Sequence, residues 1–125
     1  MRVLILEDHS DTRLVMERAM AYHGHEVKSF ASAGAILEYC AQGNPFDLLI
    51  SDIGLPDQNG MKTLPILRES CHPFKAIAVT AFARPEELEA CRNAGFDGVL
   101  AKPISFQLLR EEIARVCQPQ PDARA

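Results

Sequence analysis

The sequence predicts an α/β fold: a five-stranded parallel sheet with strand order 2-1-3-4-5, flanked by five helices in a doubly wound arrangement. Short apolar runs alternate five times with longer amphipathic segments, which is the pattern of repeated strand–helix units. The run over residues 3–6 is continuously apolar, as expected for a strand covered on both faces. Right-handed crossovers make 2-1-3-4-5 the natural strand order for five such units.

The first unit joins a strand over residues 3–6 to a helix over residues 10–23. Ser10 suits the N-cap of this helix, and Gly24 suits the position just after its end. One face of the helix is predicted to be apolar through Val15, Met16, Ala19 and Met20.

The second unit begins with a more polar strand over residues 26–30, which places that strand near an edge of the sheet. Ser32 caps the following helix, which ends at Gly43-Asn44-Pro45. The apolar residues of this helix recur at helical spacing: Ala33, Ile36, Leu37 and Cys40.

The third unit has a strand over residues 47–51 and then a loop over 52–60 that is rich in Gly, Pro, Asp and Asn. Pro65 falls inside the helix that follows. Because proline is tolerated only in the first turn, we expect this helix to begin near Thr63 or to have an irregular first turn.

The last two units contain strands over residues 75–79 and 98–101. Pro85 opens the fourth helix and Gly95 follows its end. Ser105 caps the fifth helix, whose apolar face is Phe106, Leu109, Ile113 and Val116.

Length and composition indicate one globular domain, since the chain has 125 residues, of which 47% are hydrophobic and 24% charged. We assign residues 1–118 to this domain and residues 119–125 to a frayed tail or the start of a linker. A net charge of −4 gives no general affinity for nucleic acid or anionic lipid. No apolar stretch approaches the roughly 20 residues of a membrane span. We therefore expect neither direct nucleic-acid binding by this segment nor membrane insertion.

The four cysteines form no C-x-x-C pair. Cys40, Cys91 and Cys117 fall on apolar stripes and are expected to be small buried hydrophobes in a reducing compartment. Adjacent ligands diverge, so Cys71-His72 does not predict a zinc site. The apolar run at the N-terminus is too short for a signal peptide, and we expect a cytoplasmic protein.

Charged and polar residues follow several of the predicted strands, where a parallel sheet places its ligand sites. Glu7 and Asp8 follow the first strand, Asp52 the third, Thr80 the fourth and Lys102 the fifth. Converging carboxylates cannot all ionise without a counter-charge, which Lys102 and a hard cation such as Mg²⁺ can supply. A carboxylate held between a metal and a lysine can attack phosphorus and form an aspartyl-phosphate, with the Thr80 hydroxyl donating to a phosphoryl oxygen.

Each of these residues, taken alone, can also be explained without a functional role. Asp52 can be a turn residue, and Lys102 a solvated cation; it is their combination at one sheet edge that favours a site. His9 either lines this site or lies in a surface loop. We expect Glu86, Glu87 and Glu89 to form a solvated face that suits the positive end of the fourth helix.

The chain resembles the receiver domain of two-component response regulators, a family with a flavodoxin-like fold. The resemblance spans about residues 2–117 and rests on four motifs that occur in the right order at the right strand ends. These motifs are Glu7-Asp8, the loop from Asp52 through Leu55-Pro56 to Gly60, Thr80-Ala81 and Lys102-Pro103.

This resemblance implies that Asp52 accepts a phosphoryl group from a histidine kinase or a histidine phosphotransfer protein, with Mg²⁺ as cofactor. It implies that Asp8 ligates the metal directly, that Glu7 does so typically through water, and that the backbone carbonyl of Gly54 completes the protein ligands together with Asp52. It also implies a cis peptide bond before Pro103.

A switch is implied as well, in which Thr80 and Lys102 bind the phosphoryl group. Movement of Thr80 then reshapes the face made by the fourth helix, fifth strand and fifth helix. This face is implied to control a partner or output domain, and two copies of the chain can form a homodimer through it. The chain departs from the family at Val99, where members commonly carry Tyr or Phe. We expect Phe82 and Gly54 to influence dephosphorylation by limiting or admitting water, so that Phe82→Ala changes the lifetime of the aspartyl-phosphate.

Two other functions fit parts of the pattern. A Mg²⁺-dependent phosphohydrolase that uses an aspartyl-phosphate needs an acid two residues after its nucleophile, but that position is Gly54. A flavin-binding module needs a phosphate-cradling loop after the first strand, and the loop here is acidic. We therefore expect a phosphoryl acceptor and not a turnover enzyme.

Overall fold

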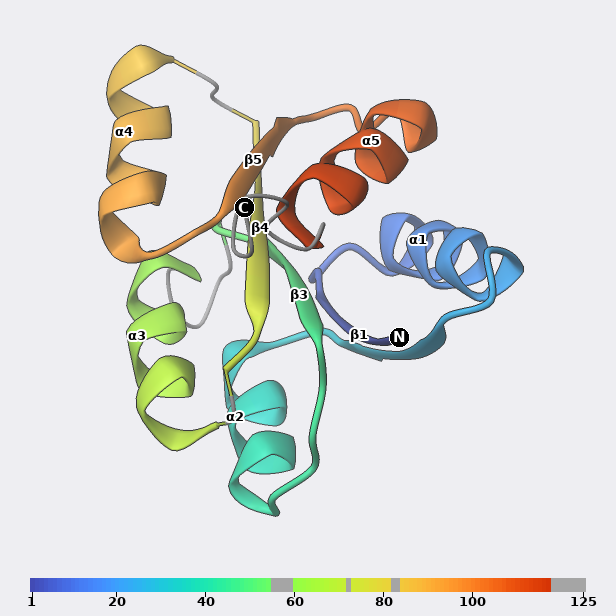
Figure 1. The fold of residues 1–125 in the computed structure, drawn as a ribbon, viewed down its shortest axis with the longest axis vertical. Helices are drawn as coiled ribbons and strands as arrows, with labels where there is room; N and C mark the ends of the chain where they lie inside the picture. Colours follow the sequence, from blue (N-terminus) through green and yellow to red (C-terminus); the bar gives the residue numbers. More distant parts are fainter. Residues whose placement is uncertain (55–59, 72, 82–83, 118–125) are drawn as a thin grey trace, which may run out of the picture.

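A computed structural model of the chain describes residues 1–54, 60–71, 73–81 and 84–117, without the side chains of residues 60 and 61. It confirms the predicted α/β fold (Figure 1). The parallel sheet has the order β2-β1-β3-β4-β5 and consists of β1 (Arg2–Leu6), β2 (Glu26–Phe30), β3 (Leu48–Asp52), β4 (Lys75–Thr80) and β5 (Gly98–Ala101). The helices are α1 (Ser10–Tyr22), α2 (Ala33–Ala41), α3 (Gly60–Ser70), α4 (Pro85–Ala94) and α5 (Phe106–Cys117).

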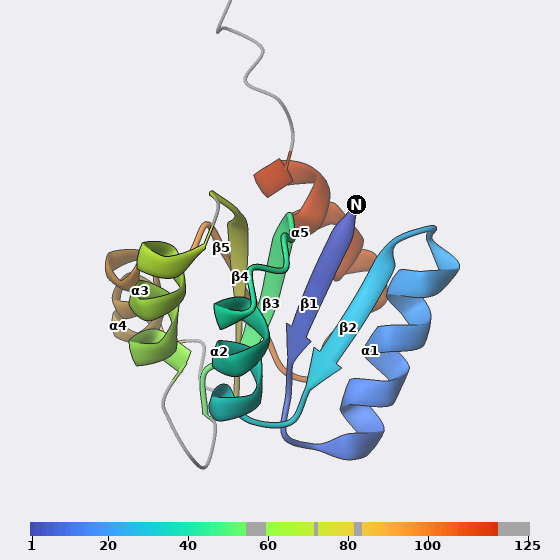
Figure 2. The same ribbon diagram turned by 90° about the horizontal axis from the view of Figure 1, so that it is seen from below.

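The sheet separates two layers of helices, with α2, α3 and α4 on one face and α1 and α5 on the other (Figure 2). Each layer has its own core. Leu64 and Phe96 belong to the core beneath α2, α3 and α4, whereas Met16 and Leu109 belong to the core beneath α1 and α5. Strands β1, β3 and β4 are buried on both faces, which explains why their sequences are continuous apolar runs.

The strand register brings the carboxyl ends of the strands to one edge. Leu6 at the end of β1 pairs with Ser51, and Thr80 at the end of β4 pairs with Ala101. Asp52, the last residue of β3, pairs with Val79. Residues that follow these ends therefore meet above the same edge of the sheet.

Two details of the helix boundaries were predicted wrongly. The N-cap of α1 is His9 and not Ser10, because the backbone of His9 is extended and its ring nitrogen Nδ1 accepts the Thr12 N–H. Helix α3 begins at Gly60, three residues before the expected start near Thr63, with Pro65 inside it; the alternative expectation, an irregular first turn, stays a prediction. Burial of Leu64 in the core supports this turn, while Pro65 itself is exposed.

Two residues expected in apolar helix faces lie at the surface. Val15 of α1 is 50% exposed and Phe106 of α5 is 36% exposed. The other capping predictions are confirmed: Ser32 accepts an N–H from α2, Ser105 accepts one from α5, and Gly95 ends α4 in the left-handed conformation that favours glycine.

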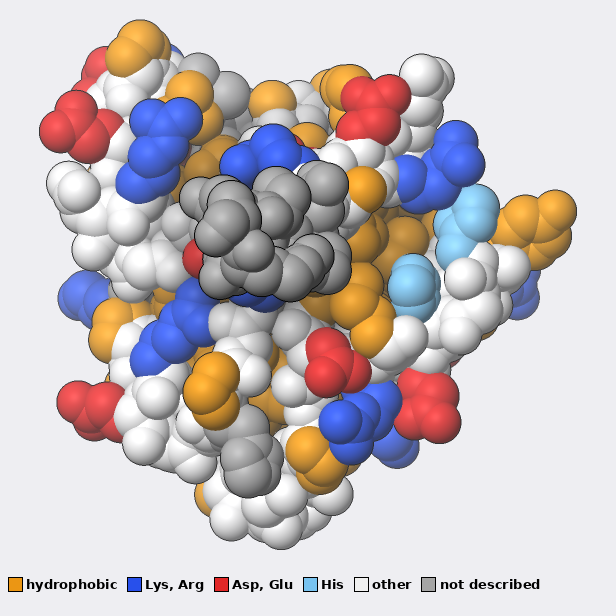
Figure 3. Space-filling model, viewed as in Figure 1, with side chains coloured by type: hydrophobic (Ala, Val, Ile, Leu, Met, Phe, Trp, Pro, Cys, Tyr) orange, Lys and Arg blue, Asp and Glu red, His pale blue; other side chains and the backbone are white. Residues whose placement is uncertain are grey.

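Residues 118–125 lie outside the described part of the chain, so the predicted boundary between a domain over 1–118 and a tail over 119–125 stays a prediction. Among the described helices, none combines the length and the apolar character that a membrane crossing requires. On the face shown in Figure 3, acidic and basic side chains are interspersed with apolar ones.

Candidate functional site

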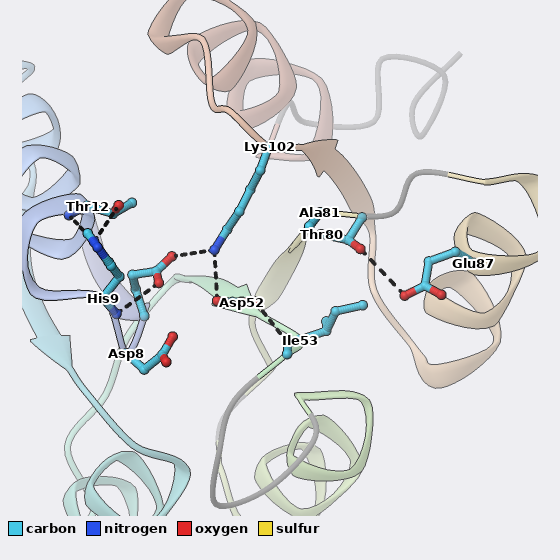
Figure 4. Close-up of a pocket in the computed structure, with 11 residues that line it drawn as sticks. Asp8, His9, Thr12, Asp52, Ile53, Thr80, Ala81, Glu87 and Lys102 are labelled. Carbon is cyan, nitrogen blue, oxygen red and sulfur yellow. Dashed lines mark hydrogen bonds and ion pairs between the residues drawn. The ribbon is translucent and has the colours of Figure 1, made fainter.

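A cleft of about 540 Å³ lies at the carboxyl edge of the sheet. Of the predicted site residues, Glu7, Asp8, Asp52, Gly54, Thr80 and Lys102 all line it (Figure 4). Pro103 does not line this cleft but borders the neighbouring groove, and its peptide bond with Lys102 is cis. The prediction that residues from four strand ends converge is thus confirmed.

Three carboxylates form the acidic side of the cleft. Glu7, Asp8 and Asp52 each offer one oxygen, and these oxygens all lie within 4.8 Å of one another. Glu7 is 1% exposed and Asp52 is 7% exposed, whereas Asp8 is exposed to solvent. Such a set of oxygens, partly buried and open on one side, can hold a hard cation that keeps some of its water.

Lys102 supplies the positive charge opposite the carboxylates. Its Nζ lies 2.9 Å from Oδ2 of Asp52 and 3.2 Å from Oε1 of Glu7. One ammonium group faces three carboxylates, so the negative charge of the cleft is only partly compensated.

The pKa values reflect this imbalance. Burial raises the pKa of Glu7 above its usual 4.5 and the charge of Asp52 raises it further, although the backbone N–H of His9 and the Lys102 ammonium act against the rise. Burial lowers the pKa of Lys102, but the hydrogen bonds and charges of Asp52 and Glu7 outweigh burial and leave that pKa above 10.5. Burial and the neighbouring Asp52 therefore disfavour the ionised form of Glu7, whereas Asp52 and Glu7 favour the charged form of Lys102.

Both oxygens of Asp52 are held in place. Oδ2 accepts a hydrogen bond from Lys102, and Oδ1 accepts the backbone N–H of Gly54 at 2.9 Å. A β-carbon at Gly54 would lie 3.6 Å from the same Oδ1. A glycine at this position therefore leaves space beside the carboxylate.

Glu87 is a site residue that sequence reasoning missed. We expected a solvated side chain, but Glu87 is half-buried and lines the cleft, and its Oε1 accepts a hydrogen bond from Oγ1 of Thr80 at 3.5 Å (Figure 4). Helix α4 begins close beyond the end of β4 and so aims its first turn at the cleft. A sign of this in the sequence is the short spacing between Thr80 and Pro85.

His9 lines the cleft, which decides between the two positions considered for it. Its Nδ1 contacts the hydroxyl of Thr12 at 3.1 Å, and Thr12 also lines the cleft. Thr12 was not predicted; the signal for it is its position one turn into the helix that follows the acidic pair.

Some residues singled out in the sequence cannot be placed. Leu55-Pro56 and Phe82 lie outside the described residues, so the expected effect of Phe82 on dephosphorylation stays a prediction. Val99 is partly buried on β5, packs against the core beneath α2, α3 and α4, and donates its backbone N–H to Glu112.

A second groove, of about 580 Å³, adjoins the cleft between α1 and the segment after β5. It shares Thr12 and Lys102 with the cleft. Val15, Ile104 and Phe106 give it an apolar lining, which accounts for the two partly exposed residues expected in the core.

Comparison with known proteins identifies similar chains. The family model of the response regulator receiver domain matches residues 3–114. The chain is 31% identical over 118 residues to the sensory/regulatory protein RpfC of Xanthomonas campestris, covering 91% of this chain and 16% of RpfC. It is 26% identical to the sensor histidine kinase RcsC of Escherichia coli, covering 90% of this chain and 12% of RcsC. The chain thus spans only a small part of these relatives.

Solved structures share the fold. A putative response regulator from Chloroflexus aurantiacus superposes with a TM-score of 0.84 at 26% identity, covering 94% of this chain and 98% of that one. A two-component response regulator from Clostridium difficile superposes with a TM-score of 0.86, covering 94% of this chain and 95% of that one; at 17% identity this likeness concerns the fold alone.

Proposed function

Because the chain belongs to the response regulator receiver domain family, we propose that Asp52 is its phosphoacceptor and that a phosphohistidine protein is the donor. The observation that carries this proposal is the position of the Asp52 carboxylate. It lies in a cleft, bound by Lys102 and Gly54, beside two further carboxylates.

The proposed reaction is a transfer between two protein side chains. An oxygen of Asp52 forms a bond to phosphorus while the phosphorus–nitrogen bond of the donor breaks, and the released imidazole takes a proton from water. Lys102 holds Asp52 in position and neutralises charge on the phosphoryl oxygens as it arrives. The rate then comes chiefly from positioning and charge neutralisation.

We infer that Mg²⁺ is the cofactor, held by Asp8, Asp52 and the backbone carbonyl of Gly54, with Glu7 reached through water. The donor set fits, since three carboxylate oxygens lie within 4.8 Å of one another and only one ammonium group offsets them. When bound, the metal neutralises charge on the phosphoryl oxygens.

The proposed switch starts at Thr80, whose hydroxyl is directed at Glu87. A phosphoryl group on Asp52 offers this hydroxyl a more highly charged acceptor and repels the Glu87 carboxylate. Thr80 and the start of α4 then shift together, which carries the change to the face of α4, β5 and α5. Val99 has no ring to reorient, so in this chain the signal runs through the backbone and α4.

The apolar groove between α1 and the segment after β5 is the proposed docking surface for the donor. It is continuous with the cleft through Thr12 and Lys102, so a helix lying in it places its own histidine near Asp52. Val15 and Phe106 provide the apolar contacts that such a helix needs. The responding partner, an output domain or separate protein, binds elsewhere, and we place the protein in the cytoplasm, where histidine kinases present their phosphoryl groups.

We propose a phosphoryl acceptor and not a phosphohydrolase. Gly54 offers no acid to protonate an ester leaving group, so only donors with good leaving groups should react. The test compares phosphoramidate, which has a phosphorus–nitrogen bond, with p-nitrophenyl phosphate, a monoester, each in the presence of Mg²⁺.

Phosphoramidate should add one phosphoryl group by intact mass, and the Asp52→Asn variant should remain unmodified. Asp47→Asn is the matched control, because it makes the same substitution in a partly exposed aspartate at the amino end of β3, away from the cleft. This variant should be phosphorylated like the wild type. Repeated turnover of p-nitrophenyl phosphate, or equal labelling of Asp52→Asn, would contradict the proposal.

A further inference from the structure

Two cysteine thiols lie close together on the side of the sheet covered by α2, α3 and α4. Cys40 belongs to the last turn of α2, and Cys71 directly follows α3. Helices α2 and α3 pack side by side (Figures 1 and 2). Cys40 belongs to the buried core on this side of the sheet, Cys71 packs against that core, and neither residue belongs to a disulfide.

The pair opens onto a surface pocket of about 330 Å³ that both cysteines line. Phe46 and Pro73 also line this pocket, and each lies two residues before the start of a strand, β3 and β4 respectively. The pocket therefore lies at the amino edge of the sheet, opposite the cleft that contains Asp52.

We propose that Cys40 and Cys71 form a redox-active dithiol site that a small-molecule disulfide, such as glutathione disulfide, oxidises to an intramolecular disulfide. The inference is independent of the phosphoacceptor function, since it rests on two neighbouring thiols that line the same surface pocket.

The two thiols have different accessibility, which assigns the order of the steps. Cys71 is partly exposed, whereas Cys40 is 4% exposed. Burial raises the pKa of Cys40 to about 12, with further increases from the charge and hydrogen bond of Cys71, so Cys40 keeps its proton. Cys71 is therefore the attacking thiol, and Cys40 is the resolving one.

In the first step the Cys71 thiolate attacks one sulfur of glutathione disulfide, forming a mixed disulfide and releasing one glutathione thiolate. In the second step the Cys40 sulfur attacks the Cys71 sulfur and its proton passes to solvent, which releases a second glutathione thiolate. The dithiol loses two electrons and two protons, and glutathione disulfide is reduced to two glutathione thiols. The second step is the slower one because Cys40 must first lose its proton.

The other cysteines provide an internal comparison. Cys91 is fully buried. Cys117 is partly exposed, like Cys71, but packs against the core beneath α1 and α5, on the other side of the sheet from Cys40. Cys117 can thus form a mixed disulfide, but its surroundings place it away from the Cys40 thiol.

The test treats the reduced full chain with glutathione disulfide and follows its intact mass and disulfide map. Wild type and Cys117→Ser should both yield a Cys40–Cys71 cross-linked peptide, which dithiothreitol reverses. In Cys117→Ser, which lacks the other partly exposed thiol, the intact chain should lose two hydrogens. Cys40→Ser should stop at a stable glutathione adduct on Cys71, and Cys71→Ser should lose the intramolecular product.

The proposal is overturned if the wild type keeps glutathione on Cys71 without closing the disulfide, or if Cys71→Ser still forms an intramolecular disulfide, which would then join another pair of cysteines. Far-UV circular dichroism of each variant confirms that the fold is retained before oxidation. Labelling of the oxidised wild type by phosphoramidate tests the Asp52 site separately, so either conclusion can fail without the other.

Discussion

Replacing Glu7 by glutamine should stabilise the protein while weakening its hold on magnesium. Glu7 is almost fully buried, and its carboxylate lies within 4.8 Å of those of Asp8 and Asp52. With an effective dielectric constant near 20, each like-charge pair at that distance costs about 3.5 kcal/mol. The attraction between Glu7 and Lys102 at 3.2 Å stabilises the folded state by about 5 kcal/mol on the same scale.

The two repulsions therefore exceed the attraction by about 2 kcal/mol, and exposure of Asp8 to water reduces the difference to about 1 kcal/mol. Glutamine keeps the shape of Glu7, and its oxygen can still accept the hydrogen bond of Lys102 or of the His9 N–H. We expect the free energy of unfolding of Glu7→Gln to be about 1 kcal/mol higher than that of the wild type without Mg²⁺.

The assay is urea unfolding followed by circular dichroism, in EDTA and in Mg²⁺. Mg²⁺ should stabilise the wild type more than Glu7→Gln, because binding to the folded state adds to stability according to affinity. Glu38→Gln, the same change on the exposed face of α2, should alter stability by less than about 0.5 kcal/mol in either buffer. A less stable Glu7→Gln in EDTA would refute the reasoning, since Glu7 would then act mainly as the partner of Lys102.

Three further outcomes follow from the charges of the described residues. The stabilising effect of Glu7→Gln should shrink as pH falls through the raised pKa of Glu7 toward 4.5, because the folded wild type binds a proton at Glu7 more tightly than the unfolded chain does. Unfolding curves in EDTA over this pH range measure the difference in stability between the two proteins, and a difference that does not change with pH would contradict the prediction. Glu112→Gln should have the opposite sign and cost about 1 kcal/mol at neutral pH, since the hydrogen bond of Arg115 lowers the pKa of Glu112; this stability is present above pH 4.5 and is lost as pH falls through the lowered value. Glu87→Gln should raise the rate of phosphorylation by acetyl phosphate about threefold, because one negative charge facing the incoming anion is removed. A slower reaction would contradict this and would indicate that Glu87 promotes the reaction by orienting the Thr80 hydroxyl.

The sequence predicted the fold well because its strongest local patterns all agree with the same arrangement of strands and helices. The continuous apolar runs of β1 and β3 had no other explanation than strands buried on both faces, and the caps at Ser32 and Gly95 mark helix ends through local chemistry. Topology then placed Asp52 and Lys102 together, although they are 50 residues apart in the chain.

The errors arose where tertiary packing overrides a local preference. Pro65 disfavours the second turn of α3, yet burial of Leu64 extends the helix through it. Phe106 follows the apolar period of α5, but the groove beside α1 leaves it partly exposed.

Glu87 shows a different kind of limit. Its position in the first turn of α4 is explained equally well by the helix dipole and by a role at the cleft. Only the angle at which α4 leaves β4 decides between these explanations, and that angle is a tertiary property. The contact between Cys40 and Cys71 is hidden for the same reason, since each cysteine alone has the pattern of an apolar residue.

The most direct test of the phosphoacceptor site combines chemical phosphorylation with mapping of the modified residue. The chain is incubated with acetyl phosphate in Mg²⁺ or in EDTA, and the product is fragmented and analysed by mass spectrometry. Gathering of the three carboxylates around Mg²⁺ predicts one phosphoryl group, located on Asp52, in Mg²⁺ only. An adduct on another residue, or the same yield on Asp52 in EDTA, would contradict it.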